Sequence, residues 1–142
     1  AGTLTGISGS TDLIKVGLVR KIVSRGISIG EIGVTGKARI IKNNLDMSLI
    51  CPGEILFVPE ELMKNIPLSK NIAGIVTNQN VNDVYALFNK NNKKISTICN
   101  LENMDNHQIS NGDLITLQLN EGVIYMGQIE DDDDAIDKYK YV

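Results

Sequence analysis

The chain has 142 residues, 42% hydrophobic and 22% charged, a balance typical of one globular domain and not of a disordered segment. Aromatic residues make up only 4% and tryptophan is absent, so the core must be mainly aliphatic. A net charge of −3 and a pI near 5.1 give no electrostatic reason to bind nucleic acid or an anionic membrane. No apolar stretch approaches the ~18 residues that span a bilayer, and the first residues carry no signal-peptide pattern.

The alternation of apolar residues and the positions of turn residues predict a series of strands. These strands are expected over residues 13–19, 21–26, 37–42, 55–58, 72–77, 95–99, 113–119 and 123–126. The last two are separated by Asn120, Glu121 and Gly122, which predict a hairpin turn.

Two short helices are predicted among these strands. The first begins at Pro59 with two acids in its first turn and must end before Pro67. The second runs from Asn82 to about residue 90, with Asn82 or Asp83 as its N-cap. Its apolar residues Val84, Leu87 and Phe88 follow helical spacing and predict a buried face. The chain is therefore predicted to be a mixed α/β domain.

Cys51 and Cys99 are the two cysteines, and one histidine, His107, could join them. Their spacing is not that of a metal site, so we expect no metal ion in this chain. Buried free thiols in a reducing compartment are favoured over a disulfide.

Residues 75–88 combine the end of an apolar strand, a polar turn and the first turns of a helix. Free backbone N–H groups at such a helix start favour an anion such as phosphate. This segment resembles the phosphohistidine loop of the swivelling domain found in phosphoenolpyruvate-utilising enzymes. In that family a histidine carries the phosphoryl group, and Tyr85 occupies its position here.

The resemblance covers most of the chain, through residues 30–41, 52–59, 73–77, 111–117 and 121–127. It implies a swivelling-type β/β/α domain, with mixed sheets and a few short helices, over residues 30–129. The segment 130–142 begins with five consecutive acids and is expected to be a solvated, mobile tail, with partner binding as the alternative.

Residues 8–16 resemble the last strand of pyruvate kinase, in which a Ser-Gly-x-Thr loop precedes the strand. Some pyruvate kinases carry an extra swivelling-type domain directly after that strand. The same order here assigns residues 1–19 to the end of a kinase body and 20–29 to a link. In pyruvate kinases that respond to sugar phosphates this loop helps to bind the effector, so Ser8, Gly9, Ser10 and Thr11 are the candidate effector-binding residues. The family's arginine is replaced by Thr5 or a neighbour.

The resemblance implies an accessory C-terminal domain of a pyruvate kinase. The parent enzyme would transfer a phosphoryl group from phosphoenolpyruvate to ADP in glycolysis, using magnesium and potassium bound outside this chain. The kinase body of the same polypeptide would be the partner, within a homo-tetramer in the cytosol or plastid stroma. No cofactor is implied for this segment itself.

The phosphohistidine motif is altered at several positions together. Asn80 and Val81 replace the family's paired glycines, and Asp83 replaces a threonine, adding a charge that repels a phosphoryl group. A phenol with a pKa near 10 is a poor nucleophile, so Tyr85 is interpreted as a packed or partly buried ring at the helix start. The later family motif is reduced at residues 95–100. We therefore expect no catalytic residue in this chain.

Two alternatives stay open on the sequence alone: an active phosphoryl carrier of another phosphotransferase, and a sensor that binds a small molecule in the old cleft. The remaining polar residues add no further site. His107 lies in a polar loop, and Asp105, Asp113 and Glu121 form no paired-carboxylate motif.

Overall fold

The structure is a computed structural model that describes residues 21–104 and 108–127. Within this part of the chain, the elements are β1 (Ile22–Arg25), β2 (Ile27–Ile29), β3 (Val34–Ile40), η2 (Asn44–Leu49), β4 (Glu54–Val58), η3 (Glu60–Asn65), β5 (Ile72–Thr77), α1 (Val81–Lys90), β6 (Thr97–Cys99), β7 (Leu114–Gln118) and β8 (Val123–Met126). The elements η2 and η3 are short 3₁₀ helices.

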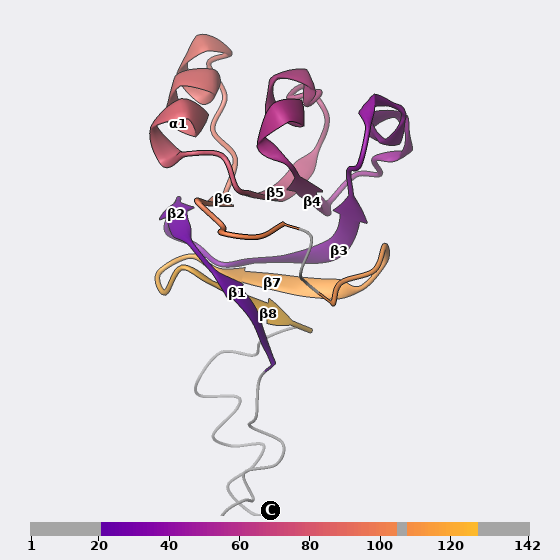
Figure 1. Cartoon of the computed structure of the whole chain (residues 1–142), viewed down its shortest axis with the longest axis vertical. Helices are drawn as coiled ribbons and strands as arrows, with labels where there is room; N and C mark the ends of the chain where they lie inside the picture. The colour runs from indigo at the N-terminus through magenta and orange to yellow at the C-terminus, as the bar shows by residue number, and fades with distance from the viewer. Residues whose placement is uncertain (1–20, 105–107, 128–142) are drawn as a thin grey trace, which may run out of the picture. The chain divides into compact units, whose positions relative to one another are not determined.

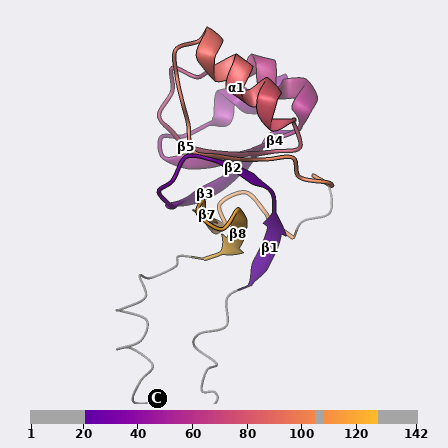
Figure 2. The ribbon, with the colours of Figure 1, turned by 90° about the vertical axis from the view of Figure 1, so that its left-hand side faces the viewer.

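The described strands form one sheet in the order β1-β8-β7-β3-β4-β5-β6-β2. Strands β3, β4, β5 and β6 are parallel, and the remaining pairs are antiparallel. All three helices lie over the parallel part, while β7, β8 and β1 lie on its other side (Figures 1 and 2). The mixed α/β class with few short helices is confirmed, but the strands join into a single sheet and not into several.

The sheet folds over itself at two corners. The first half of β3 pairs with β7 and its second half pairs with β4, so one strand belongs to both layers. On the opposite side, β1 pairs with β8 and β2 pairs with β6, with Gly26 alone between them. A strand that passes from one layer to the other is how a single sheet encloses a core.

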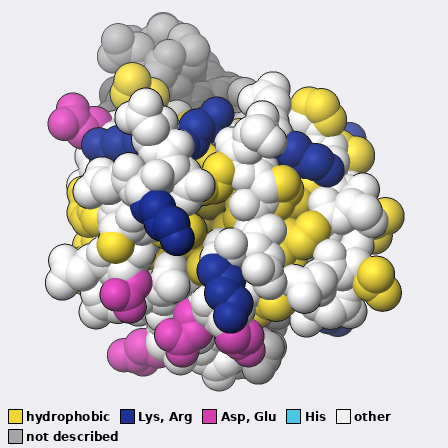
Figure 3. Space-filling model, turned by 90° about the horizontal axis from the view of Figure 1, so that it is seen from above, with side chains coloured by type: hydrophobic (Ala, Val, Ile, Leu, Met, Phe, Trp, Pro, Cys, Tyr) yellow, Lys and Arg dark blue, Asp and Glu magenta, His cyan; other side chains and the backbone are white. Residues whose placement is uncertain are grey.

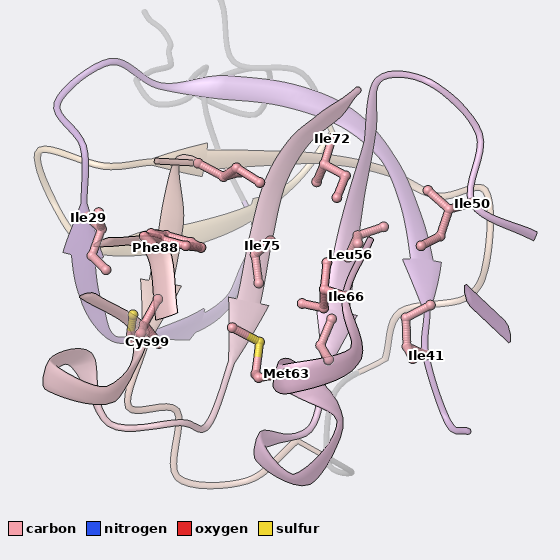
Figure 4. Packing of buried hydrophobic residues seen from close by; sticks show 13 residues of the cluster. Ile29, Ile41, Ile50, Leu56, Met63, Ile66, Ile72, Ile75, Phe88 and Cys99 are labelled. Carbon is pink, nitrogen blue, oxygen red and sulfur yellow. The ribbon is translucent and has the colours of Figure 1, made fainter. Parts of the chain in front are cut away.

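Two apolar clusters fill the spaces on either side of the parallel strands. One packs Phe88 of α1 and Met63 of η3 against Leu56 and Ile75 of the sheet (Figure 4). The other lies between the two layers and includes Phe57, Val76, Ile115 and Ile124. Residues of β4 therefore alternate between the clusters, which explains why this strand is buried along its whole length.

Gly26 is required where the chain passes from β1 to β2. Its amide donates to the carbonyl of Gly122 at 2.9 Å. A Cβ at this position would lie 2.3 Å from the Cys99 carbonyl oxygen and 2.7 Å from Cγ2 of Ile98. The two layers meet here too closely for any side chain.

Several expected boundaries are corrected by the structure. The strand expected at 21–26 is confirmed as β1, whereas β2 was not expected, and both belong to the sheet although residues 20–29 were assigned to a link. Strand β3 begins at Val34 and not at residue 37, β6 begins at Thr97 and not at residue 95, and α1 begins at Val81 with Asn80 as its N-cap. The expected strand at 13–19 and the acidic tail at 130–142 lie outside the described residues.

The cysteines are free, as expected, but only one of them is buried. Cys99 lies in the core, where burial raises the pKa of its thiol to about 12. Cys51 is exposed in the turn before β4, so its expected burial is wrong.

A partly buried ion pair joins the two central strands. Arg39 of β3 donates from Nε and Nη2 to the two carboxylate oxygens of Glu54 in β4, at 3.1 and 2.9 Å. Glu54 Oε1 also accepts from the amide of Cys51 at 2.7 Å. Burial by itself would raise the pKa of Glu54, but the bonds from Arg39 and Cys51 outweigh burial and hold that pKa below its ordinary value of 4.5.

Replacing Gly26 by alanine should destabilise the domain by about 2 kcal/mol or more, because the added methyl group overlaps backbone as well as side-chain atoms. Urea unfolding followed by circular dichroism measures this loss. The control is Ser24→Ala on the same strand, which should change the free energy of unfolding by less than about 0.5 kcal/mol. Equal stabilities of the two variants would contradict the tight crossing.

Glu54→Gln should lower the free energy of unfolding by about 2 kcal/mol at pH 7, because it leaves the Arg39 guanidinium largely buried without its carboxylate. A lowered folded-state pKa means that the pair stabilises the fold fully above pH 4.5 and loses this effect as the pH falls through the folded value. The difference from wild type should therefore narrow below pH 4.5. Urea unfolding at a series of pH values tests this, with exposed Glu31→Gln as control. A difference that stays constant down to about pH 3 would contradict it.

Candidate functional site

The phosphohistidine-like loop lies at the carboxyl ends of the parallel strands. Strand β5 ends at Thr77, a short turn follows, and α1 begins at Val81. This edge of a parallel sheet is where ligands commonly bind in α/β domains, because the loops there face solvent and the helices present their N-termini.

Two of the backbone donors at the start of α1 are bonded to the protein's own side chains. Oδ1 of Asn80 accepts from the amide of Asn82 at 2.8 Å, and Oδ1 of Asn100 accepts from the amide of Val81 at 3.0 Å. The amide of Val84 donates to the Asn80 carbonyl at 3.1 Å. Amide oxygens therefore occupy donors that an anion would need at this helix start.

Asn100 comes from the end of β6 and also fixes the loop. Its amide donates to the carbonyl of Gln79 at 3.0 Å, and the amide of Leu101 donates to the carbonyl of Thr77 at 3.3 Å. The backbone of Asn100 has φ = 60°, a left-handed conformation that asparagine tolerates better than most residues. Asn100 could not be identified as a cap from the sequence, because the Val81 amide that it caps lies 19 positions away.

Negative charge gathers around the same edge. Asp83 lies in the first turn of α1, Glu60 and Glu61 begin η3, and Glu102 follows β6. Seen from the helix side, acidic side chains group along one edge of the molecule (Figure 3). A carboxylate in the first turn stabilises a helix, but it also repels an incoming phosphoryl group.

Tyr85 does not pack into the core. It is 41% exposed, which is compatible with the partly buried ring expected at the helix start. Val84 and Phe88 are buried, so the predicted apolar face of α1 is confirmed. The ring lies on the solvent side because positions 84 and 88 share one face, which turns position 85 away from the sheet.

The other residues considered as sites divide into those that the structure describes and those that it does not. Asp113 accepts from the amide of Ser110, and Glu121 accepts from the hydroxyl of Tyr125, so both carboxylates have structural partners. The effector-loop residues Ser8, Gly9, Ser10 and Thr11 lie outside the described residues, as do Asp105 and His107.

Neither a metal cluster nor a membrane-spanning helix is found in residues 21–104 and 108–127. No three His, Cys, Asp or Glu side chains there are grouped closely enough to hold a metal ion. None of the helices there has the length and apolar character needed to cross a bilayer.

Comparison with known proteins identifies the relatives of the chain, although no protein-family model matches it. Pyruvate kinase 2 of Synechocystis sp. is 33% identical over 129 residues, which cover 91% of this chain and 22% of that protein. The pyruvate kinase of Staphylococcus saprophyticus is 29% identical over 89% of this chain and 22% of its own length. The homologues of this chain are pyruvate kinases. The chain spans about a fifth of the length of these pyruvate kinases.

Similarity to solved structures is weaker. The microcin C7 self-immunity protein MccF matches with a TM-score of 0.48 and 14% identity, over 72% of this chain and 41% of its own. The solution structure of the Enzyme I (nEIt) protein matches with a TM-score of 0.42 and 16% identity, over 67% of this chain and 38% of its own. Scores below 0.5 support no conclusion about fold or function.

Asn100→Ala should destabilise the domain by about 2 kcal/mol, because it removes the acceptor for the Val81 amide and places alanine in a left-handed conformation. Asn100→Asp keeps an acceptor at the helix N-terminus and should cost less than about 1 kcal/mol. Urea unfolding of both variants measures the difference. Equal losses for alanine and aspartate would show that the side-chain oxygen does not cap α1.

Proposed function

We propose that this chain is the accessory C-terminal domain of a pyruvate kinase. The observation that carries the proposal is its homology to pyruvate kinases, at 33% identity over 91% of the chain but only 22% of the relative. The order of segments supports it, because residues 8–16 resemble the last strand of the kinase body and precede the domain. Phosphoryl transfer from phosphoenolpyruvate to ADP, with its magnesium and potassium ions, would then belong to parts outside this chain.

In this proposal the domain has lost the phosphohistidine chemistry of its fold family. The capping of Val81 by Asn100 and of Asn82 by Asn80 supports this, because those donors are no longer open to a phosphate. Asp83 adds a repulsive charge, and an exposed phenol stands at position 85. These changes act together, so no single residue accounts for the loss.

The role that remains is structural or regulatory. Residues 22–29 form strands of the sheet. The part of the polypeptide that precedes the domain is therefore connected directly to a strand of the domain's core. Such a domain can stabilise a homo-tetramer or set the response to an effector by packing against the kinase body. Residues 8–11 remain the candidate effector loop, and cytosol or plastid stroma the proposed location.

The test is to truncate the full-length protein after Val19. The shortened enzyme should keep phosphoenolpyruvate-dependent ATP formation, but it should lose tetramer stability and melt at least about 5 °C lower, because a surface covered by the domain becomes exposed. Steady-state kinetics, sedimentation and calorimetry measure these properties. Tyr85→Phe in the full-length protein is the control and should leave all of them unchanged.

Two outcomes would contradict the proposal. If truncation left assembly, stability and kinetics unchanged, the domain would have no structural or regulatory role. If the intact protein incubated with radiolabelled phosphoenolpyruvate carried stable label within residues 22–127, the domain would be an active phosphoryl carrier.

A further inference from the structure

A groove of about 1060 Å³ opens beside the altered loop, at the carboxyl ends of β3, β4 and β5. Among the lining residues, Ile40 ends β3, Pro59 follows β4 and Asn78 follows β5. Residues after β6, among them Glu102, also line it. The groove is thus assembled from four separate segments.

Its lining combines an apolar floor with an acidic rim. Phe57 and Ile41, only 1% and 2% exposed, lie at the floor. Among the described lining residues, three carry carboxylates (Asp46, Glu61 and Glu102) and one carries an ammonium group (Lys42), so acidic side chains outnumber basic ones there.

Two of these three carboxylates stabilise the start of a helix, and the third does not. The Asp46 carboxylate accepts from the amides of Lys42 and Asn43 and completes a capping box for η2. Glu61 lies in the first turn of η3, where an acid is favourable. Glu102 is exposed and begins no helix among the described residues. Stabilisation of a helix start, which accounts for Asp46 and Glu61, therefore does not account for Glu102.

We propose that this groove docks a segment bearing lysine or arginine from the remainder of the same polypeptide. The proposal rests on the proposed function, in which this chain is about a fifth of a longer enzyme. Because such a segment belongs to the same molecule, its effective concentration at the groove is in the millimolar range. A modest electrostatic attraction between the segment and the rim is then enough to keep the groove occupied.

The charge of the rim favours this occupant over an anionic ligand. A phosphate or carboxylate ligand would meet the carboxylates of Glu61 and Glu102. A divalent cation is equally disfavoured, because no three acidic, histidine or cysteine side chains in the described ranges are close enough to bind one. A long basic side chain can place its charge at the rim and its methylene groups on the apolar floor.

The experiment joins carboxylates directly to amines in the intact full-length protein with a carbodiimide, followed by mass spectrometry of the cross-linked peptides. The expected product links Glu61 to a lysine that precedes this chain in the polypeptide. Glu102→Lys should reduce the Glu61 link at least fivefold, because it repels the basic segment without changing the reacting carboxylate. Glu31→Lys, an equal change at an exposed glutamate outside the groove, should leave the link intact.

Three results would overturn the proposal: no link from Glu61, a link unaffected by Glu102→Lys, or a link that joins light and heavy copies when isotopically labelled protein is mixed with unlabelled protein. Kinase activity is measured on the same samples. Activity without the link refutes the docking alone, whereas absence of activity refutes the proposed function.

Discussion

The crossing at Gly26 is the contact on which both cores depend, because the chain there leaves one layer of the sheet and enters the other. Strand β1 completes the layer of β7 and β8, and β2 completes the layer of the parallel strands. A Cβ at Gly26 would lie 2.3 Å from the Cys99 carbonyl oxygen, and a Cβ at Gly122 would lie 2.5 Å from the Gly26 carbonyl oxygen. The corner at β3 repeats this arrangement, since a Cβ at Gly36 would lie 2.5 Å from the Gly53 carbonyl oxygen. Two residues without side chains therefore allow one sheet to enclose a core between its halves.

The arrangement of the strands also determines where the loop between β5 and α1 lies. Because β3, β4, β5 and β6 run parallel, their carboxyl ends share one edge, and the segments that follow them meet there. That edge brings Asn100, from the end of β6, within 3.0 Å of the α1 amide that it caps. At this helix start, neutral side-chain oxygens accept from the amides of Val81 and Asn82. The chain itself therefore supplies acceptors that backbone amides require.

Local sequence patterns predicted most of the elements, and long-range contacts decided what they missed. Alternation located β5 and the β7–β8 hairpin, and helical spacing located the buried face of α1 through Val84 and Phe88. The same patterns could not show that residues 22–29 close the sheet, because pairing of β1 with β8 joins segments about a hundred positions apart. The helix η2 was not predicted although Asn43 and Asp46 have capping-box spacing, because its apolar residues Leu45, Met47 and Leu49 alternate with period two and do not follow helical spacing.

The resemblance implies an altered motif at Asn80, Val81, Asp83 and Tyr85, and the structure adds the contacts that this loop makes. Substitution of a nucleophile alone leaves a binding site in place, and such a site can still hold a phosphate. Here the donors themselves are bonded, and the rim around them is acidic. Asn100 also holds the 77–81 turn against β6, because its amide donates to the Gln79 carbonyl. The side chain that occupies the Val81 amide therefore also stabilises the loop, and this double role supports the proposal of a structural or regulatory domain.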